Sequence, residues 1–288
     1  MDASSPDPTV SSAVPSQVDG RLMLRVERAD GADRLRDLYM HDPLRVLFPR
    51  PAKGDPLQAV LATTSGGLVG GDRLTLDIAV GENAALQVVG QAAEKIYRSL
   101  GADTRVTLRL DAAPGSLLEV LPQGTILFDG ARLRRTVAIN VAEGARVLTG
   151  EILSLGRAAS GERVTSGLLR DRWQIRRDGR LVWADALALD GDIAAAVASP
   201  SGFGGASALG TLLYAGPDGE RGLELARSLL DQAATGVRRG ASLVDGIMVV
   251  RFLSADGAAL RTAFGAFWRG FRAGACGLPE RLPTIWNV

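Results

Sequence analysis

The chain has almost none of the side chains that bind transition metals tightly or act as nucleophiles. Its 288 residues include one cysteine, Cys276, and one histidine, His41. A single cysteine excludes an internal disulfide, which is the usual situation in a reducing compartment. A serine-histidine-aspartate triad would need His41 as its base, and the sequence has no G-x-S-x-G segment. Cys276 lies in an apolar, helix-like segment, so we expect a small buried side chain and no catalytic role.

An excess of one charge and a long apolar run are also missing. The 33 Lys and Arg residues nearly balance 32 Asp and Glu residues, so composition indicates neither a nucleic-acid partner nor an anionic membrane surface. No run reaches the roughly 18 apolar residues that a bilayer span needs. Residues 1–20 lack the basic start and apolar centre of a signal peptide and are rich in Ser, Pro and Asp. We therefore expect a disordered tail over residues 1–20 and a cytoplasmic protein.

Two glycine-rich segments also fail to match the known nucleotide-binding motifs. Residues 66–73 (GGLVGGDR) are glycine-rich, but a P-loop requires Lys and then Ser or Thr where Asp72 and Arg73 stand. Residues 202–207 (GFGGAS) lack the third glycine of the dinucleotide fingerprint. Both segments are typical of tight turns. The sequence thus predicts no catalytic residue and no cofactor-binding residue.

What the chain does have, from residue 21 to about 190, is apolar alternation with a period of two. Leu74–Val80 and Val106–Leu110 are clear examples, and Asp178-Gly179 between two such runs predicts a hairpin. Expected strands recur about every 10 to 15 residues with no helical pattern between them. Without crossover helices we expect predominantly antiparallel pairing, in a sandwich or a coiled stack of strands.

The last third has helical patterns. We expect helices near residues 220–239 and 258–275, separated by a buried strand over residues 243–253. The fold class is therefore α+β, with two C-terminal helices on a β-rich body. We find no repeat or linker that would divide residues 21–288, so we expect a single domain there.

Carboxylate side chains are the remaining groups that could have a chemical role. Two interpretations stay open: a pair of acids could serve a β-rich hydrolase, or the acids could be paired with the many arginines. A tight nickel or zinc site is not expected, because oxygen ligands hold late first-row metals weakly. The acids in or beside strands and turns are Asp72, Glu94, Glu119, Asp129, Glu151 and Glu162.

Several segments, in this order and spacing, resemble the UreD (UreH) family of urease accessory proteins. They are residues 64–74 (TSGGLVGGDRL), 90–99 (GQAAEKIYRS), 121–132 (LPQGTILFDGAR), 151–162 (EILSLGRAASGE), 210–213 (GTLL) and 283–286 (PTIW). Two departures matter. Thr63-Thr64-Ser65 replaces the family's His-Pro or similar lead into the glycine segment, and Gly124 stands where the family usually has a glutamate.

The resemblance implies a β-rich, non-catalytic scaffold. It would assemble with the accessory proteins UreF and UreG on apo-urease, with GTP bound by UreG, and assist nickel delivery through an interior route. No cofactor would be tightly bound, and nickel would only be in transit. A paralogue that binds proteins without nickel transfer is the other family-based alternative.

Such a route would be lined by acidic and hydroxyl groups, and nearby arginines would pair with the acids. The expected weak metal contacts are Asp72, Glu94, Glu151 and Glu162, and the further channel or structural candidates are Tyr97, Arg98, Asp129, Arg132 and Arg157.

Overall fold

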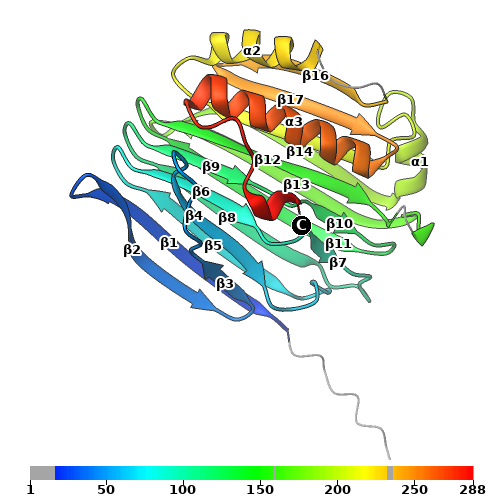
Figure 1. Ribbon diagram of the computed structural model, residues 1–288. Helices are drawn as coiled ribbons and strands as arrows, with labels where there is room; N and C mark the ends of the chain where they lie inside the picture. The colour runs from blue at the N-terminus through cyan, green and yellow to red at the C-terminus, as the bar shows by residue number, and fades with distance from the viewer. Residues whose placement is uncertain (1–16, 158–159, 232–235, 288) are drawn as a thin grey trace, which may run out of the picture.

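The computed structural model describes residues 17–157, 160–231 and 236–287, which form two β-sheets and a helical layer (Figure 1). Residues 1–16 of the expected disordered tail lie outside the described residues. The strands are β1 (Asp19–Ala29), β2 (Ala32–His41), β3 (Leu44–Leu47), β4 (Leu57–Thr63), β5 (Arg73–Val80), β6 (Ala85–Gly90), β7 (Glu94–Ile96), β8 (Thr104–Ala112), β9 (Leu117–Leu121), β10 (Thr125–Leu127), β11 (Arg132–Val141), β12 (Arg146–Leu155), β13 (Ser166–Arg177), β14 (Arg180–Asp192), β15 (Ala208–Ala215), β16 (Arg238–Val244) and β17 (Ile247–Ser254). The helices are α1 (Ile193–Ala198), α2 (Gly219–Asp231), α3 (Gly257–Cys276) and the 3-10 helix η2 (Thr284–Asn287).

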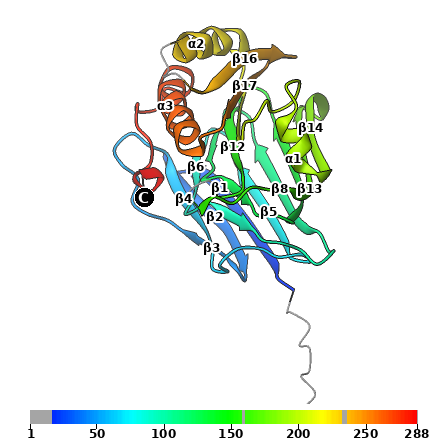
Figure 2. The same cartoon turned by 90° about the vertical axis from the view of Figure 1, so that its right-hand side faces the viewer.

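The two sheets pack face to face, and the helices cover one of them. Sheet A has the strand order β14-β13-β11-β8-β5-β1-β2. Sheet B has the order β16-β17-β15-β12-β9-β6-β4-β3, and the short strands β7 and β10 extend it beside β12. Helices α2 and α3 lie on the outer face of sheet B, against β15, β16 and β17 (Figures 1 and 2).

The central strands are parallel, so predominantly antiparallel pairing is not confirmed. From β5 to β13 the chain passes back and forth between the sheets, and β5, β8, β11 and β13 are parallel neighbours in sheet A. Strands β4, β6, β9 and β12 are parallel neighbours in sheet B. Each return passes through a strand of the opposite sheet, which replaces the crossover helix that parallel pairing usually needs. The coiled stack of strands that the alternation allowed is therefore the arrangement found, with antiparallel pairs at the sheet margins.

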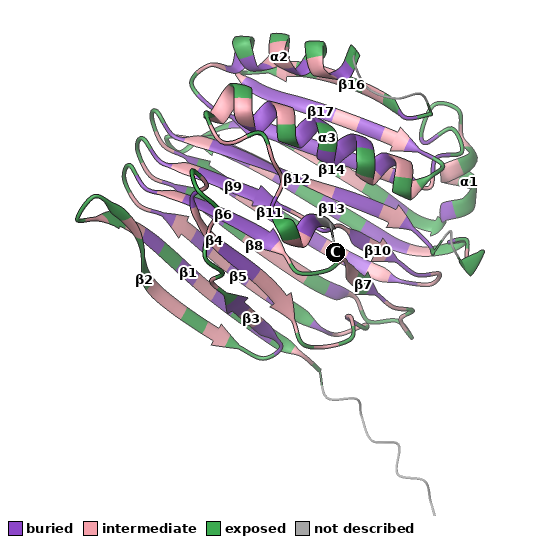
Figure 3. Ribbon diagram, viewed as in Figure 1, coloured by how far each residue is buried: buried purple, intermediate pink, exposed green. Residues whose placement is uncertain are grey.

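The alternation places one side of each strand in a common core. Leu22, Leu76, Leu108, Val137 and Trp173 are successive cross-strand neighbours on the inner face of sheet A. Figure 3 shows the resulting change between buried and exposed residues along the strands. A second apolar cluster lies between sheet B and the helices, around Phe252, Phe264 and Trp268. Burial of these two clusters stabilises the three-layer arrangement.

The helical region differs from expectation in its boundaries. The helix expected over 220–239 ends at Asp231, residues 232–235 lie outside the described part, and Arg238 begins β16. Strand pairing of β16 with β17 takes precedence there over helical spacing. The helix expected over 258–275 is confirmed as α3, and α1 was not expected. Among the described helices, none has the length and hydropathy to span a bilayer.

Two Asp-Gly turns have the same geometry. Asp178 and Gly179 have φ of 48° and 81°, and the hairpin expected there joins β13 to β14. Asp245 and Gly246 have φ of 45° and 76° and join β16 to β17. Positive φ at both central residues matches the right-handed twist of a hairpin. The single strand expected over residues 243–253 is therefore wrong, because Asp245-Gly246 turns the chain.

Candidate functional site

Asp72 supports the backbone at the end of the glycine segment. One of its carboxylate oxygens accepts a hydrogen bond from the amide of Val18 (2.9 Å), and the other accepts one from the amide of Val69 (2.8 Å). Its side chain is buried. Because both oxygens bind backbone amides, Asp72 fixes the start of β1 to the glycine turn.

Asp129 fixes a turn in a similar way. Its Oδ1 accepts hydrogen bonds from the amide of Thr165 (2.8 Å), the hydroxyl of Thr165 (2.9 Å) and the amide of Ser166 (3.1 Å). Its Oδ2 accepts one from Arg98 (2.8 Å). The amide of Thr165, with smaller contributions from these neighbours, lowers the pKa of Asp129. The carboxylate therefore ties the turn after β10 to the start of β13.

Glu162, Arg157 and Tyr97 lie beside this turn. Arg157 Nε donates to Glu162 (2.8 Å), and this bond is the main reason that the pKa of Glu162 is lowered. The Arg157 guanidinium also lies 4.4 Å from the ring centroid of Phe128, which contacts the Tyr97 ring at 4.7 Å. The Tyr97 hydroxyl donates to the carbonyl of Gly66 (3.0 Å). These polar groups have protein partners, so this cluster has a structural explanation.

Arg132 belongs to a separate ion pair. Its Nε donates to Asp103 (2.7 Å), and Arg134 binds the other oxygen of the same carboxylate. Burial alone would raise the pKa of Asp103, but the two guanidiniums lower it. The partner of Arg132 is therefore an acid that the sequence did not single out.

Glu94 is half-buried on β7. It accepts a hydrogen bond from the Thr63 hydroxyl (2.8 Å), and burial raises the pKa of its carboxyl group. Its cross-strand neighbour on β10 is Thr125. The Thr125 hydroxyl accepts a bond from Arg135 (3.2 Å), so the strand neighbour of Glu94 contacts a buried guanidinium.

Glu151 is the candidate that lies between the two sheets. Arg135 of sheet A pairs with Glu151 of sheet B and with Asp171 of sheet A, to which its Nη2 donates at 2.6 Å. The side chains of Arg135, Glu151 and Asp171 are 7%, 14% and 10% exposed. The second oxygen of Glu151 is buried and has no hydrogen-bond partner within the described residues. Burial raises the pKa of Glu151, Arg135 partly opposes it, and Asp171 raises it further.

A small cavity of about 20 Å³ lies against this carboxylate. Glu151 and Asp171 line it, together with Asp185 and Arg251, which pair with each other across the two sheets. Thr211 also lines the cavity and accepts a hydrogen bond from Arg251 (2.8 Å). A volume of this size is about that of one water molecule. We call Arg135, Glu151, Asp171, Asp185 and Arg251 the interior charged cluster.

Strand alternation explains why these five charged side chains point between the two sheets, where Arg135, Glu151 and Asp171 are buried and Asp185 and Arg251 are partly exposed. Each occupies a position where its strand otherwise points an apolar residue inward, as Leu169 and Trp173 do on either side of Asp171 along β13. Of the five, only Glu151 was predicted from the sequence as a site residue. A charged residue at the buried position of an alternating strand was the available signal. Which of these strands face one another depends on how the chain winds between the two sheets, and this winding could not be predicted from the sequence.

A second buried ion pair is fully satisfied. Glu119 and Arg272 have no exposed surface, and Arg272 Nε donates to Glu119 at 2.7 Å. Trp268 and Gln87 also donate to Glu119, each at 2.7 Å, and Asp55 binds Arg272 at 3.0 Å. With every group paired, this cluster anchors α3 to sheet B and has no capacity left for a ligand.

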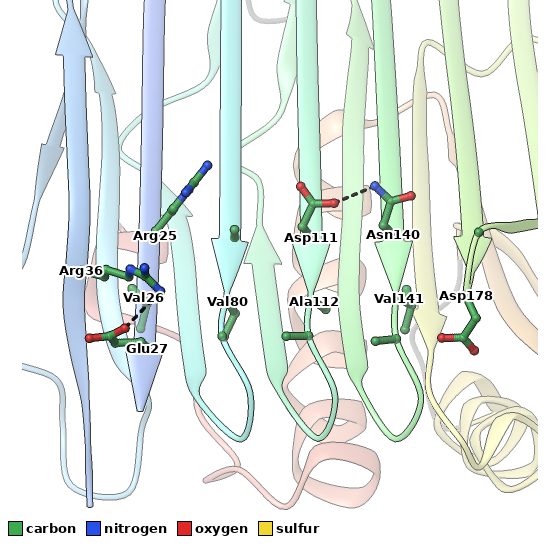
Figure 4. Close-up of a pocket in the computed structure, with 15 residues that line it drawn as sticks. Arg25, Val26, Glu27, Arg36, Val80, Asp111, Ala112, Asn140, Val141 and Asp178 are labelled. Atoms are coloured by element: carbon green, nitrogen blue, oxygen red, sulfur yellow. Dashed lines mark hydrogen bonds and ion pairs between the residues drawn. The ribbon is translucent and has the colours of Figure 1, made fainter. Parts of the chain in front are cut away.

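An open depression of about 610 Å³ lies at the ends of sheet A strands, and none of the expected site residues lines it (Figure 4). Four of its polar groups form two pairs: Asn140 donates to Asp111 (2.6 Å), and Arg36 pairs with Glu27 (3.4 Å). Arg25 and Asp178 also line it. Arrangement and chemistry therefore favour the interior charged cluster as the candidate site.

Comparisons with known proteins give the family. The model of the UreD urease accessory protein family matches residues 18–287. A urease accessory protein UreD of Magnetococcus marinus is 44% identical over 278 residues, which is 95% of this chain and 96% of that protein. Those of Methylobacterium sp. (strain 4-46) and Xanthobacter autotrophicus are 43% and 42% identical, covering 98% and 97% of this chain and 99% and 95% of theirs. This chain belongs to the UreD family.

Membership of the UreD family agrees with the prediction from the sequence that the chain has no catalytic residues. The relatives are named as urease accessory proteins, not as enzymes, so the family supports a role in urease maturation. The hydrolase alternative finds no support in these names. Within the described residues, no group of three or more His, Cys, Asp or Glu side chains is arranged to hold a metal ion.

The structure also gives a reason for one departure from the UreD pattern. Gly124 has φ of 100°, and a Cβ there would lie 2.9 Å from the carbonyl oxygen of Ile152. Only glycine adopts this conformation readily, and any side chain would meet the backbone of β12. Gly124 is therefore required by the local backbone.

Proposed function

We propose that the protein is a scaffold of urease maturation that assembles with UreF and UreG on apo-urease in the cytoplasm. We further propose that nickel passes through the space between the two sheets. The supporting observation is Glu151, whose buried carboxylate has one oxygen without a partner and lies against a small cavity between the sheets. Nucleotide chemistry belongs to the partner UreG.

The ligands of this route suit transfer more than storage. Carboxylate and hydroxyl oxygens bind nickel more weakly than imidazole or thiolate does, so an ion bound at Glu151 can leave again. Glu151, Asp171, Asp185 and Thr211 offer oxygen atoms along the cavity, and the three carboxylates do not converge on one point as a storage site would need. The cargo is the nickel cation, which would have to lose most of its hydration waters to enter a cavity the size of one water molecule, and the chain holds it only in passing.

Arg135 opposes the cation in this proposal. Its guanidinium binds Glu151 and Asp171, which are the same two carboxylates that an arriving cation would use. Entry of nickel therefore requires Arg135 to release at least one of them. Without metal, Arg135 neutralises only one of the two carboxylates that it binds, so the group of three keeps a formal charge of −1 that a cation could balance.

The test is in vitro activation of apo-urease with UreF, UreG, GTP and Ni²⁺. We expect Glu151→Gln to lower the initial activation rate on the order of tenfold, because the amide cannot replace an anionic ligand. The matched control is Glu143→Gln, an exposed turn residue, which should activate as well as the wild type. Co-purification with UreF should be unchanged in both variants.

The outcomes separate the two halves of the proposal. Full activation by Glu151→Gln would exclude the interior route and leave the scaffold role intact. A wild-type protein that neither co-purifies with UreF nor increases activation would exclude the scaffold role.

A further inference from the structure

Four arginines form a row across the outer face of sheet A. Arg73 of β5 is the cross-strand neighbour of Arg105 of β8, Arg105 is the neighbour of Arg134 of β11, and Arg134 is the neighbour of Arg170 of β13. Adjacent strands are about 4.8 Å apart, so the row extends over four parallel strands at nearly one level. We call these four residues the arginine row.

The arginine row faces solvent. Each arginine alternates along its strand with buried residues such as Leu74 and Leu169, so its side chain points away from the core. Helices α2 and α3 lie on the far side of sheet B and leave this face uncovered (Figures 1 and 2). The next level of the same face carries the hydroxyl residues Thr75, Thr107 and Thr136, again in register.

The arginine row carries more charge than its neighbours neutralise. Arg134 pairs with Asp103, and Arg170 pairs with Asp190 at 3.1 Å. Asp19, the cross-strand neighbour of Arg73, forms its ion pair with Arg21, and Arg73 interacts with it only at longer range. Arg105 lies between two arginines and forms no ion pair with the described acids.

This arrangement costs stability in the isolated protein. Like charges on directly opposed strand positions repel each other, and a parallel sheet holds them at a fixed spacing. The threonines one level away indicate that the same strands accept small, uncharged β-formers at equivalent positions. The repulsion would be relieved by carboxylates placed over the row.

We propose that the arginine row is a docking surface for an acidic face of a protein partner. Guanidinium groups bind planar carboxylates with paired hydrogen bonds, and a flat sheet presents several of them at once. A nucleic-acid backbone fits less well, because Asp19, Asp77 and Asp111 interrupt the positive charge of this face, and a continuous line of phosphates cannot avoid them as individual carboxylates of a protein can. Positive and negative groups interspersed in this way match a protein surface of complementary pattern.

The first test uses poly-L-glutamate as a carboxylate probe and duplex DNA of equal charge concentration as the competing polyanion. We expect the wild type to bind poly-L-glutamate more tightly than DNA at low salt. Arg73→Glu/Arg105→Glu should weaken poly-L-glutamate binding by about tenfold or more. The matched control, Arg221→Glu/Arg227→Glu, makes the same charge change on the exposed face of α2 and should stay within about twofold.

A second measurement uses urea unfolding. Arg105→Thr should raise the urea midpoint of the isolated protein, because it removes repulsion with both neighbours. Added poly-L-glutamate should raise the midpoint of the wild type more than that of Arg105→Thr. Tighter binding to DNA, equal losses in the two double variants, or a lower midpoint for Arg105→Thr would each overturn the proposal.

Discussion

At the scale of single residues, Asp129 shows how a carboxylate organises a turn, and its contribution should depend on pH. Its pKa is lowered in the folded protein, so the ionised form stabilises the fold. That stabilisation is complete above the ordinary pKa of an aspartate and disappears as the pH falls through the lowered folded value. Asp129→Asn should therefore cost about 1–2 kcal/mol at neutral pH and less near pH 2.5, because that pH lies below the ordinary pKa of an aspartate.

Urea unfolding of the wild type and Asp129→Asn at both pH values checks this. Asp178→Asn, at an exposed hairpin turn, is the control and should show no comparable difference between them. A cost for Asp129→Asn that is the same at both pH values would contradict the assignment to the ionised carboxylate.

Residue types could be predicted from the sequence better than residue partners. Glu151 was selected as an acid in a strand, and its burial between the sheets agrees with an interior position. Arg135 and Asp171 were not selected, because their meeting depends on which strands the coil brings together. Contacts between side chains on strands of different sheets depend on the tertiary structure, which the local alternation of apolar residues does not determine.

At the scale of elements, α3 depends on one buried ion pair. Arg272 binds Glu119, Asp55 and the carbonyl of Arg281, so it joins α3 to sheet B and to the C-terminal segment. Arg272→Met would leave Glu119 buried without its cation, and we expect a loss of about 3–5 kcal/mol in the free energy of unfolding. Thermal and urea unfolding, followed by tryptophan fluorescence, would report it.

A matched control lies on the same helix. Arg269 is exposed and its ion pair with Glu280 is long, at 3.8 Å, so Arg269→Met should cost no more than about 0.5 kcal/mol. Similar small losses in the two variants would show that the buried pair does not anchor α3.

Element boundaries followed the Asp-Gly turn signals more closely than the helical spacing of apolar residues. Asp178-Gly179 predicted its hairpin correctly, because the two strands it joins are adjacent in the sequence. The helix expected to reach residue 239 was cut short, because β16 pairs with β17. Asp245-Gly246 contained the same hairpin signal, but the apolar residues around it favoured one continuous strand.

At the scale of the whole molecule, the winding of the chain between sheets A and B determines where charged side chains can be buried. A strand that returns through the opposite sheet allows parallel neighbours without crossover helices, which is why the alternation alone did not settle the pairing direction. The same winding puts inward-facing side chains of sheets A and B opposite each other, and the interior charged cluster joins the two sheets in that space.

Stability and function can be separated in this cluster. Removing only Arg135, as Arg135→Met, leaves two buried carboxylates without their cation and should cost about 3–5 kcal/mol. The triple variant Arg135→Met/Glu151→Leu/Asp171→Leu removes all three charges and should be as stable as the wild type or more stable, by up to about 4 kcal/mol. Its assembly with UreF should be unchanged, but urease activation should fall at least as far as with Glu151→Gln. A triple variant that is stable and still activates urease fully would show that the charges between the sheets serve neither stability nor nickel transfer.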